Sequence, residues 1–228
     1  KAAAAARALA PAAAAKTPGR IGVYARLAEE AASPEKLRET MKLMKSVGIE
    51  FIFPAGKGSA VYWDSQVAPK ELVKDRDYMG RIIQCAHAEG LKVYPVSCVA
   101  TEGGEAGPNA LLTSNPSWAF FYDGARRGYI DPGNADARHY EVSLISELVS
   151  KYDVDGLSLD YCRCPNRVGY TDSGREEFLK KHNVDLAQIA GAGSETLDTE
   201  GGKKAARSIA ASARANPIWP EWQKWKTA

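Results

Sequence analysis

The sequence has no apolar run of about 18 residues, the length a helix needs to cross a bilayer, so we expect no membrane span. Charge of one sign is also missing, since 30 basic residues nearly balance 28 acidic ones and the formal net charge is +2. Such a balance lacks the strong positive field of proteins that bind nucleic acid or anionic membranes. We therefore expect no nucleic-acid partner.

Metal and cofactor motifs are missing as well. The three histidines show neither H-x-H nor HExxH spacing, and the pair Cys162 and Cys164 has no second pair to complete a zinc site. No glycine fingerprint follows the first predicted strand, and the sequence has no G-x-S-x-G elbow and no P-loop. We predict no metal and no cofactor, and we interpret the four cysteines as small, buried apolar side chains.

Strand and helix patterns alternate along the chain. Strands are predicted at residues 21–27, 50–54, 91–96 and 154–159, and helices at 75–90, 135–151 and from an N-cap at Ser33. The helix at 135–151 is expected to turn Val142, Ile145 and Val149 inward. Residues 101–134 are predicted to be irregular, and a further helix is expected at 173–182.

This alternation predicts an α/β fold with a parallel sheet. The loops after the strands are much longer than the turns before them, as in a (β/α)₈ barrel, so a doubly wound sheet is the second choice. We expect residues 21–228 to form the N-terminal half of a barrel, about four βα units, with a flexible excursion at about 189–216. Half a barrel leaves sheet edges exposed, so the chain is a fragment, the other half lies beyond it, or two copies complete each other.

The end of the fourth predicted strand holds the leading candidate for a catalytic group. Asp160 closes an apolar run, and Tyr161 and Arg163 follow it in a turn. A carboxylate at the mouth of a buried parallel strand is where α/β barrels carry their chemistry. The structural alternative is a buried Asp–Arg pair that holds the loop. Asp153, Asp155 and His87 fall at the opposite end of the predicted strands, where we expect structural roles.

Several motifs in order resemble a glycosyl-hydrolase-like family that is itself similar to family ten glycoside hydrolases. The resemblance runs from about residue 21 to 225 and is carried by the segments 58–65, 86–93, 115–118, 129–133, 152–165 and 222–225. The most specific is Tyr152-Asp-Val-Asp-Gly156 with Asp160 and Arg163 after it. Cys164 departs from the tyrosine that is usual in the family. The resemblance implies a (β/α)₈ barrel.

The resemblance also implies hydrolysis of glycosidic bonds, which normally needs two carboxyl groups. Asp160 would be the nucleophile or base, and the proton donor would come from a later strand. Side chains expected to bind the sugar include those at the end of the first strand, aromatic residues in long loops, and the turn after Asp160. These candidates are Tyr24, Arg26, Tyr62, Trp63, Trp118, Asp131, Tyr161 and Arg163.

The expected substrate is a polysaccharide, with peptidoglycan or another amino-sugar glycan as the first choice by resemblance alone. The alternative is a non-catalytic carbohydrate-binding or scaffolding protein on the same barrel. Residues 1–20 are Ala-rich and are interpreted as the remnant of an export signal, a docked helix or a linker. We therefore expect an extracellular or periplasmic location.

Overall fold

A computed structural model describes residues 20–122, 125–163, 169–183 and 185 of the chain. They divide into two compact units. Unit 1 holds the residues up to Val99 together with Tyr140–Cys162, and unit 2 holds Ala100–His139 and the described residues from Arg163 on. The expected excursion at 189–216 and residues 1–19 of the Ala-rich segment lie outside the described residues.

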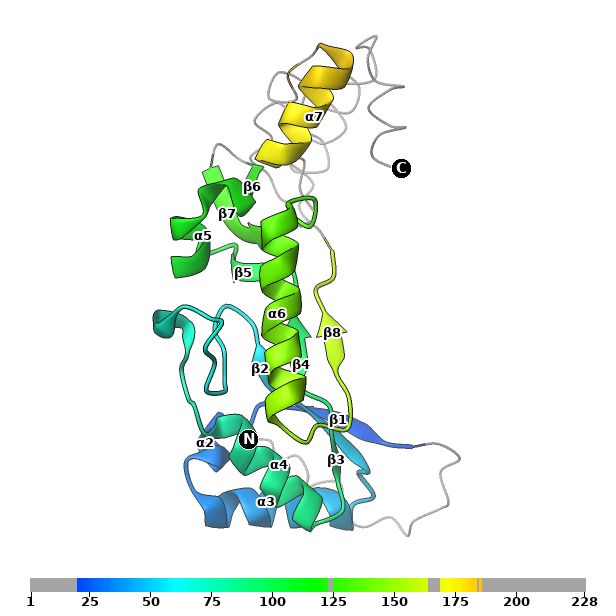
Figure 1. Ribbon diagram of the computed structural model, residues 1–228. Coiled ribbons are helices and arrows are strands. Elements are labelled where there is room, and N and C mark those ends of the chain that lie inside the picture. The colour runs from blue at the N-terminus through cyan, green and yellow to red at the C-terminus, as the bar shows by residue number, and fades with distance from the viewer. Residues whose placement is uncertain (1–19, 123–124, 164–168, 184, 186–228) are drawn as a thin grey trace, which may run out of the picture. The chain divides into compact units, whose positions relative to one another are not determined.

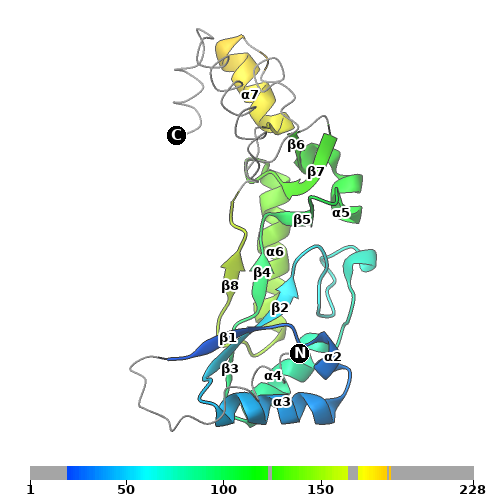
Figure 2. The ribbon, with the colours of Figure 1, turned by 180° about the vertical axis from the view of Figure 1, so that it is seen from behind.

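Unit 1 is built on a parallel sheet of five short strands. They are β1 (Gly22–Ala25), β2 (Phe51–Lys57), β3 (Lys92–Val93), β4 (Val96–Cys98) and β8 (Ser158–Asp160). The order is β1-β2-β4-β8, with β3 also paired to β2, and every pairing is parallel (Figure 2). Neighbouring strands thus follow chain order, whereas a doubly wound sheet would place β1 in its interior. The sheet therefore has the order of the first part of a (β/α)₈ barrel, and it does not close among the described residues.

Two helices of unit 1 pack side by side, as Figure 1 shows. Helix α3 (Pro34–Ser46) begins where the Ser33 hydroxyl accepts a hydrogen bond from the Lys36 N–H, as the N-cap predicted. Helix α4 (Tyr78–Ala88) lies within the predicted range 75–90, and its buried side chains include Met79, Ile82 and Ile83. The short helices α2 (Ala28–Ala31) and η1 (Lys70–Leu72) follow β1 and β2.

Helix α6 (Ala135–Lys151) has the predicted bounds but a different buried face. Val142 is 63% exposed and Val149 44%, so the inward face predicted for this helix is wrong. The buried side chains of the part in unit 1 are Tyr140, Glu141, Leu144 and Leu148. Both stripes repeat at helical spacing, and the stripe with the larger leucine side chains buries more apolar surface.

Two of the strand predictions need correction. The strand expected at 91–96 is divided into β3 and β4 by Tyr94 and Pro95, and a proline has no N–H to donate within a sheet. The strand expected at 154–159 begins only at Ser158 and reaches Asp160. Asp160 thus belongs to the last strand position rather than to the loop after it.

Unit 2 contains a three-stranded antiparallel sheet where we expected irregular chain. Its strands are β5 (Thr101–Gly104), β6 (Ala119–Tyr122) and β7 (Ala125–Ile130), in the order β5-β7-β6. The remaining elements are α5 (Ala110–Ser114), η2 (Pro116–Trp118) and α7 (Asp172–His182), the last close to its predicted bounds. A small apolar core forms among Ala100, Leu112, Ala119, Ile130 and Ala137. The prediction failed because glycines inside short strands look like turns.

Candidate functional site

The carboxyl ends of the unit 1 strands bring four different side chains to one edge of the sheet. Strand β1 ends at Ala25, β2 at Lys57, β4 at Cys98 and β8 at Asp160. In barrel enzymes this edge carries the active site. Asp160 is the acidic residue among these four strand ends.

Asp160 is held by its backbone and leaves its side chain exposed. Its Cα pairs with that of Cys98 in the parallel register, and its carbonyl accepts a 2.8 Å hydrogen bond from the Val99 N–H. The carboxylate Oδ1 accepts a 2.7 Å hydrogen bond from the N–H of Tyr161. Tyr161 has a φ of +48°, a left-handed conformation that a tyrosine adopts only at a cost. This turn redirects the chain directly after the carboxylate.

Alternation along the strands places Asp160 on an aromatic face of the sheet. Tyr24 pairs with Phe53 in the register, their rings stack at 4.8 Å, and the ring of Tyr94 lies 5.8 Å from that of Phe53. The hydroxyl of Tyr24 lies 3.4 Å from that of Ser158, which fixes Ser158 on the same face. Asp160 is two residues further along β8 and therefore points to this face too. In a closed barrel this face, opposite the helices, is the interior.

Two glycines make room for the rings of this face. A Cβ at Gly22 would lie 2.0 Å from the ring of Phe51, and one at Gly156 would lie 2.8 Å from the ring of Tyr94. Any larger residue at either position would displace a ring. The positions of the Phe51 and Tyr94 rings thus require glycine at residues 22 and 156.

The charge of Asp160 affects the thiol of Cys98 on the neighbouring strand β4. Burial raises the pKa of the Cys98 thiol, and the nearby carboxylate of Asp160 raises it further. Cys85, Cys98 and Cys162 are free thiols. Cys85 is buried as expected, but Cys162 is exposed, so the interpretation of the cysteines as core residues is wrong for Cys162.

The other candidates near this edge differ in exposure. Tyr24 is 67% exposed and Tyr161 41% exposed, and Arg26 is exposed as well. Arg163 is exposed and is grouped with unit 2. The structure thus brings Tyr24, Tyr161 and Asp160 to accessible positions in unit 1.

The loop after β2 contains one candidate that is wrong as an exposed sugar platform. Trp63 is fully buried, and its indole N–H donates a 3.0 Å hydrogen bond to Glu147 on α6. The buried ring offers no free face for stacking. Tyr62 is half-buried, with its ring 5.4 Å from that of Tyr78.

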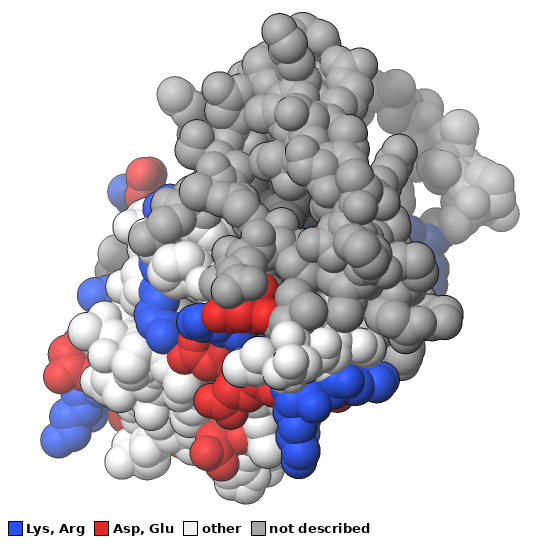
Figure 3. All heavy atoms as spheres, turned by 90° about the horizontal axis from the view of Figure 1, so that it is seen from above, with Lys and Arg blue, Asp and Glu red and all other residues white. Residues whose placement is uncertain are grey.

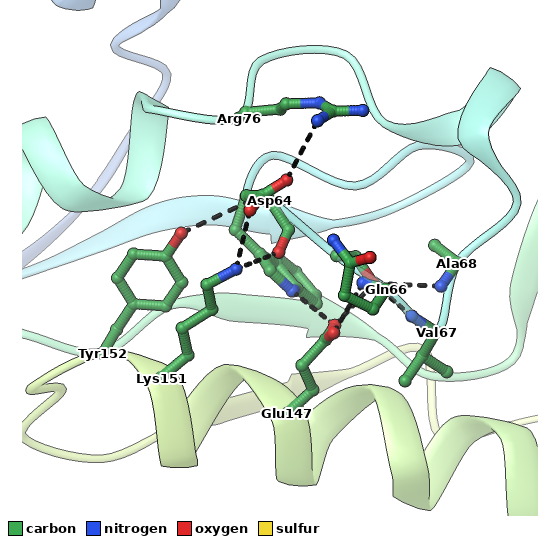
Figure 4. Close-up of polar contacts among 10 residues, drawn as sticks. Asp64, Gln66, Val67, Ala68, Arg76, Glu147, Lys151 and Tyr152 are labelled. Carbon is green, nitrogen blue, oxygen red and sulfur yellow. Dashed lines mark hydrogen bonds and ion pairs between the residues drawn. The ribbon is translucent and has the colours of Figure 1, made fainter.

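Glu147 and Lys151 of α6 fasten this loop. Glu147 also accepts hydrogen bonds from the Ser65 hydroxyl and the Gln66 N–H. Burial alone would raise the pKa of Glu147, but these three donors outweigh it, so its pKa lies below the usual value. Lys151 forms an ion pair with Asp64, with 2.9 Å between Nζ and Oδ2 (Figure 4). These groups serve the fold rather than the sheet edge.

In unit 2, Asp131 and Trp118 have structural contacts. Asp131 is 4% exposed; its carboxylate accepts a 2.8 Å hydrogen bond from the Gly133 N–H and another from the Ser173 hydroxyl. Trp118 packs partly buried against the small core of this unit. Through these contacts Asp131 holds the turn before α6.

At the amino end of the sheet, the structural roles predicted for Asp155 and His87 are confirmed. The Asp155 carboxylate accepts a 2.8 Å hydrogen bond from the Val93 N–H and lies 3.0 Å from Nε2 of His87. Burial would raise the pKa of Asp155, but these hydrogen bonds outweigh it and lower the pKa.

Lys57, the last residue of β2, is not among the candidates named from the sequence. Its ammonium is buried, lies 2.9 Å from Glu141 of α6, and donates to the carbonyl oxygens of Cys98 and Val99. Its place at the end of a strand could have been recognised in the sequence, because Lys57 directly follows the apolar run Phe51-Ile-Phe-Pro-Ala-Gly56.

Charges are mixed where the described surface can be followed. Figure 3 shows acidic and basic side chains next to one another on the described part of one face. Across the described ranges, no group of three or more His, Cys, Asp or Glu residues could hold a metal ion. Nor does any helix in the described part of the chain have the length and apolarity to cross a bilayer.

Comparisons with solved structures identify glycosidases of similar fold. The alpha-L-fucosidase isoenzyme 2 from Paenibacillus thiaminolyticus is 18% identical with a TM-score of 0.54, over 86% of this chain and 30% of that one. A beta-galactosidase from the psychrophilic Marinomonas ef1 is 18% identical with a TM-score of 0.52, over 82% of this chain and 29% of that one. The chain thus spans less than a third of either enzyme, and the likeness is one of fold.

The family comparison covers most of the chain, although no curated protein sequence matches it. The profile described as glycosyl hydrolase-like 10 matches residues 21–228, from the first strand to the end of the sequence. Together with the parallel strand order of unit 1, this match confirms the resemblance drawn from the motifs. The chain belongs to the glycosyl hydrolase-like 10 family.

Proposed function

We propose that this chain is part of a glycoside hydrolase in which Asp160 is a catalytic carboxylate. The observation that carries the proposal is the position of Asp160 at the carboxyl end of β8, exposed and on the aromatic face of the sheet. A carboxylate there can reach a sugar bound over the strand ends. Its backbone is fixed by Val99, so its side chain starts from a defined position.

The proposed reaction uses Asp160 as nucleophile or base at the anomeric carbon. A second carboxyl group protonates the leaving oxygen, and we assign it to a later part of the barrel. Tyr24 and Tyr161 would contact the sugar, because both residues are exposed at this edge. Arg26 and Arg163 are retained as proposed ligands for sugar hydroxyl or carboxylate groups.

The proposed substrate is a polysaccharide, with peptidoglycan or another amino-sugar glycan as the first choice. This choice is an analogy with the family rather than a deduction from contacts. An extracellular or periplasmic location belongs to the same proposal, because such glycans lie outside the cytoplasm. Fractionation of the source cells with an antibody to the protein tests the location.

The experiment compares Asp160→Asn with the natural protein that carries this sequence. Release of reducing ends from peptidoglycan and from chitin oligomers is measured for both. The control is Asp153→Asn, since the Asp153 side chain is 95% exposed near the amino end of the sheet. Activity lost only in Asp160→Asn supports the proposal, and turnover within about tenfold of wild type, about 1.4 kcal/mol in barrier, removes the catalytic role.

A second candidate function is carbohydrate binding without hydrolysis. The exposed ring of Tyr24, which stacks on the ring of Phe53, favours it, because aromatic faces bind sugars without catalysis. Binding of the same glycans without new reducing ends, equal in wild type and Asp160→Asn, would select this alternative.

A further inference from the structure

The ammonium group of Lys57 is buried directly behind the edge that carries Asp160. The Lys57 side chain is 1% exposed and that of Glu141 is 6% exposed, with 2.9 Å between Nζ and Oε1. The ammonium also donates to the carbonyl oxygens of Cys98 at 2.9 Å and Val99 at 3.2 Å. One cation thus joins the ends of β2 and β4 to helix α6.

Stability alone is a weak reason to place such a pair here. The free energy needed to remove two charges from water is often larger than the free energy gained from their attraction. Well-packed apolar residues of similar size are frequently as stabilising as such a pair. A buried ion pair does fix geometry, because its hydrogen bonds have defined lengths and directions. The useful question is which groups the geometry of Lys57 fixes.

Two of the groups that Lys57 contacts belong to the segment that binds the Asp160 backbone. The Cys98–Val99 segment accepts from Lys57 through its two carbonyl oxygens, and the N–H of Val99 donates to the Asp160 carbonyl at 2.8 Å. Cys98 is also the register partner of Asp160. Between Ala55 and Lys57 the register shifts, so Lys57 pairs with Ser97 and points to the α6 side of the sheet. Lys57 therefore acts on Asp160 from behind, through one strand end.

We propose that Lys57 and Glu141 are positioning residues that hold the end of β4, and through it the Asp160 backbone, in the arrangement used for catalysis. The inference depends on the proposed function for its effect on turnover, but not for its effect on structure. Neither residue contacts the sugar in this proposal. Glu141 keeps the Lys57 ammonium in place, and Lys57 keeps the two carbonyl oxygens in place.

The test combines a structural and a kinetic measurement on Lys57→Met in the natural protein. We expect hydrogen exchange of the Val99 amide to rise by about tenfold or more, since its bond to Asp160 opens more often. We expect kcat to fall by about tenfold to a hundredfold with KM within about threefold, because a small misplacement of a catalytic group slows chemistry. Glu141→Gln should show the same changes at reduced size.

The control is Asp155→Asn, which weakens a less buried contact, that of Asp155 with His87, at the other end of the same sheet. It should lower the melting temperature while leaving Val99 exchange and kcat near wild type. If Lys57→Met and Asp155→Asn change Val99 exchange equally, the role of Lys57 is general stability and the inference is wrong. Unchanged Val99 exchange in Lys57→Met also overturns it.

If Lys57→Met does not fold, Glu141→Gln takes its place, because its amide keeps an oxygen acceptor near the Lys57 ammonium.

Two further outcomes separate this inference from the proposed function. If the wild-type protein cleaves no glycan, the proposed function fails, while a selective rise in Val99 exchange still supports the link from Lys57 to Asp160. Normal turnover in a variant with altered exchange keeps the link and removes its catalytic importance.

Discussion

Two aspartates near opposite ends of the last described strand of unit 1 differ in what surrounds them. Asp155, before β8, accepts a hydrogen bond from the Val93 N–H and lies beside His87. Asp160, at the end of β8, is exposed and its carboxylate accepts from the neighbouring Tyr161 N–H. One carboxylate is occupied by distant parts of the fold, and the other faces solvent.

The difference shows what kind of position a functional group needs in this fold. The amino end of the sheet is closed by contacts such as Asp155 to His87, so a carboxylate there is committed to structure. At the carboxyl end the backbone of Asp160 is fixed while its side chain remains accessible. A catalytic position needs a group that is both held in place and open to substrate, and the exposed Asp160 carboxylate, which accepts from the Tyr161 N–H, meets both conditions.

The largest expected effect comes from replacing the carboxylate by an amide at either of these two aspartates, Asp155 before β8 and Asp160 at its end. Asp160→Asn should lower turnover about a thousandfold, about 4 kcal/mol in barrier, while its melting temperature stays near wild type. Asp155→Asn should lose about 1–3 kcal/mol of unfolding free energy and keep its turnover within severalfold. Reducing-end assays and urea unfolding measure the two quantities. Loss of stability in Asp160→Asn with normal turnover would reverse the comparison.

The next effect concerns two neighbouring aromatic residues in the loop after β2. Trp63→Phe removes the indole N–H that binds Glu147 and leaves space in a fully buried site, so we expect about 2 kcal/mol lower unfolding free energy. Tyr62→Phe, at a half-buried position, should change it by less than about 0.5 kcal/mol. Equal effects in urea unfolding would mean that the loop is not held through Trp63.

Acid should weaken the amino end of the sheet. The pKa of Asp155 is lower in the folded than in the unfolded protein, so its stabilising contribution is full above the unfolded value and is lost as pH falls through the folded one. The unfolded value is about 4. Melting temperatures of wild type and Asp155→Asn should therefore differ at pH 6 and converge below pH 4. If the difference in melting temperature grows as the pH falls, the pKa of Asp155 is not lowered by folding and the prediction is wrong.

The sequence predicted the parts of the fold that repeat. Helix α3 with its Ser33 cap, the bounds of α6, and the parallel order of the strands follow from period and capping residues. Burial was harder to predict, because α6 carries two apolar stripes and only tertiary packing decides which one faces inward. The sheet of unit 2 was missed because β5 ends in Gly103 and Gly104, which look like a turn.

The candidate site was predicted in its central residue and less well in its surroundings. Asp160 could be found because it directly follows the segment 154–159 that was predicted as a strand, a purely local signal, although the strand itself is limited to Ser158–Asp160. Trp63 was misplaced because its burial depends on Glu147, which is far away in sequence. The role of Lys57 depends on Glu141 and on two carbonyl oxygens of another strand, and such contacts leave no local pattern.

The smallest expected effect concerns Tyr24, whose ring lies on the same face as Asp160. Tyr24→Phe keeps the ring stacked on Phe53 and removes the 3.4 Å contact with Ser158, so unfolding free energy should change by less than about 0.5 kcal/mol. Tyr24→Ala also removes the ring, so glycan affinity should fall by about fivefold, about 1 kcal/mol, while Tyr24→Phe binds nearly as wild type. Titration calorimetry with a chitin oligomer measures both. Equal affinity of Tyr24→Ala and wild type would separate the aromatic face from sugar binding and leave Asp160 without a platform beside it.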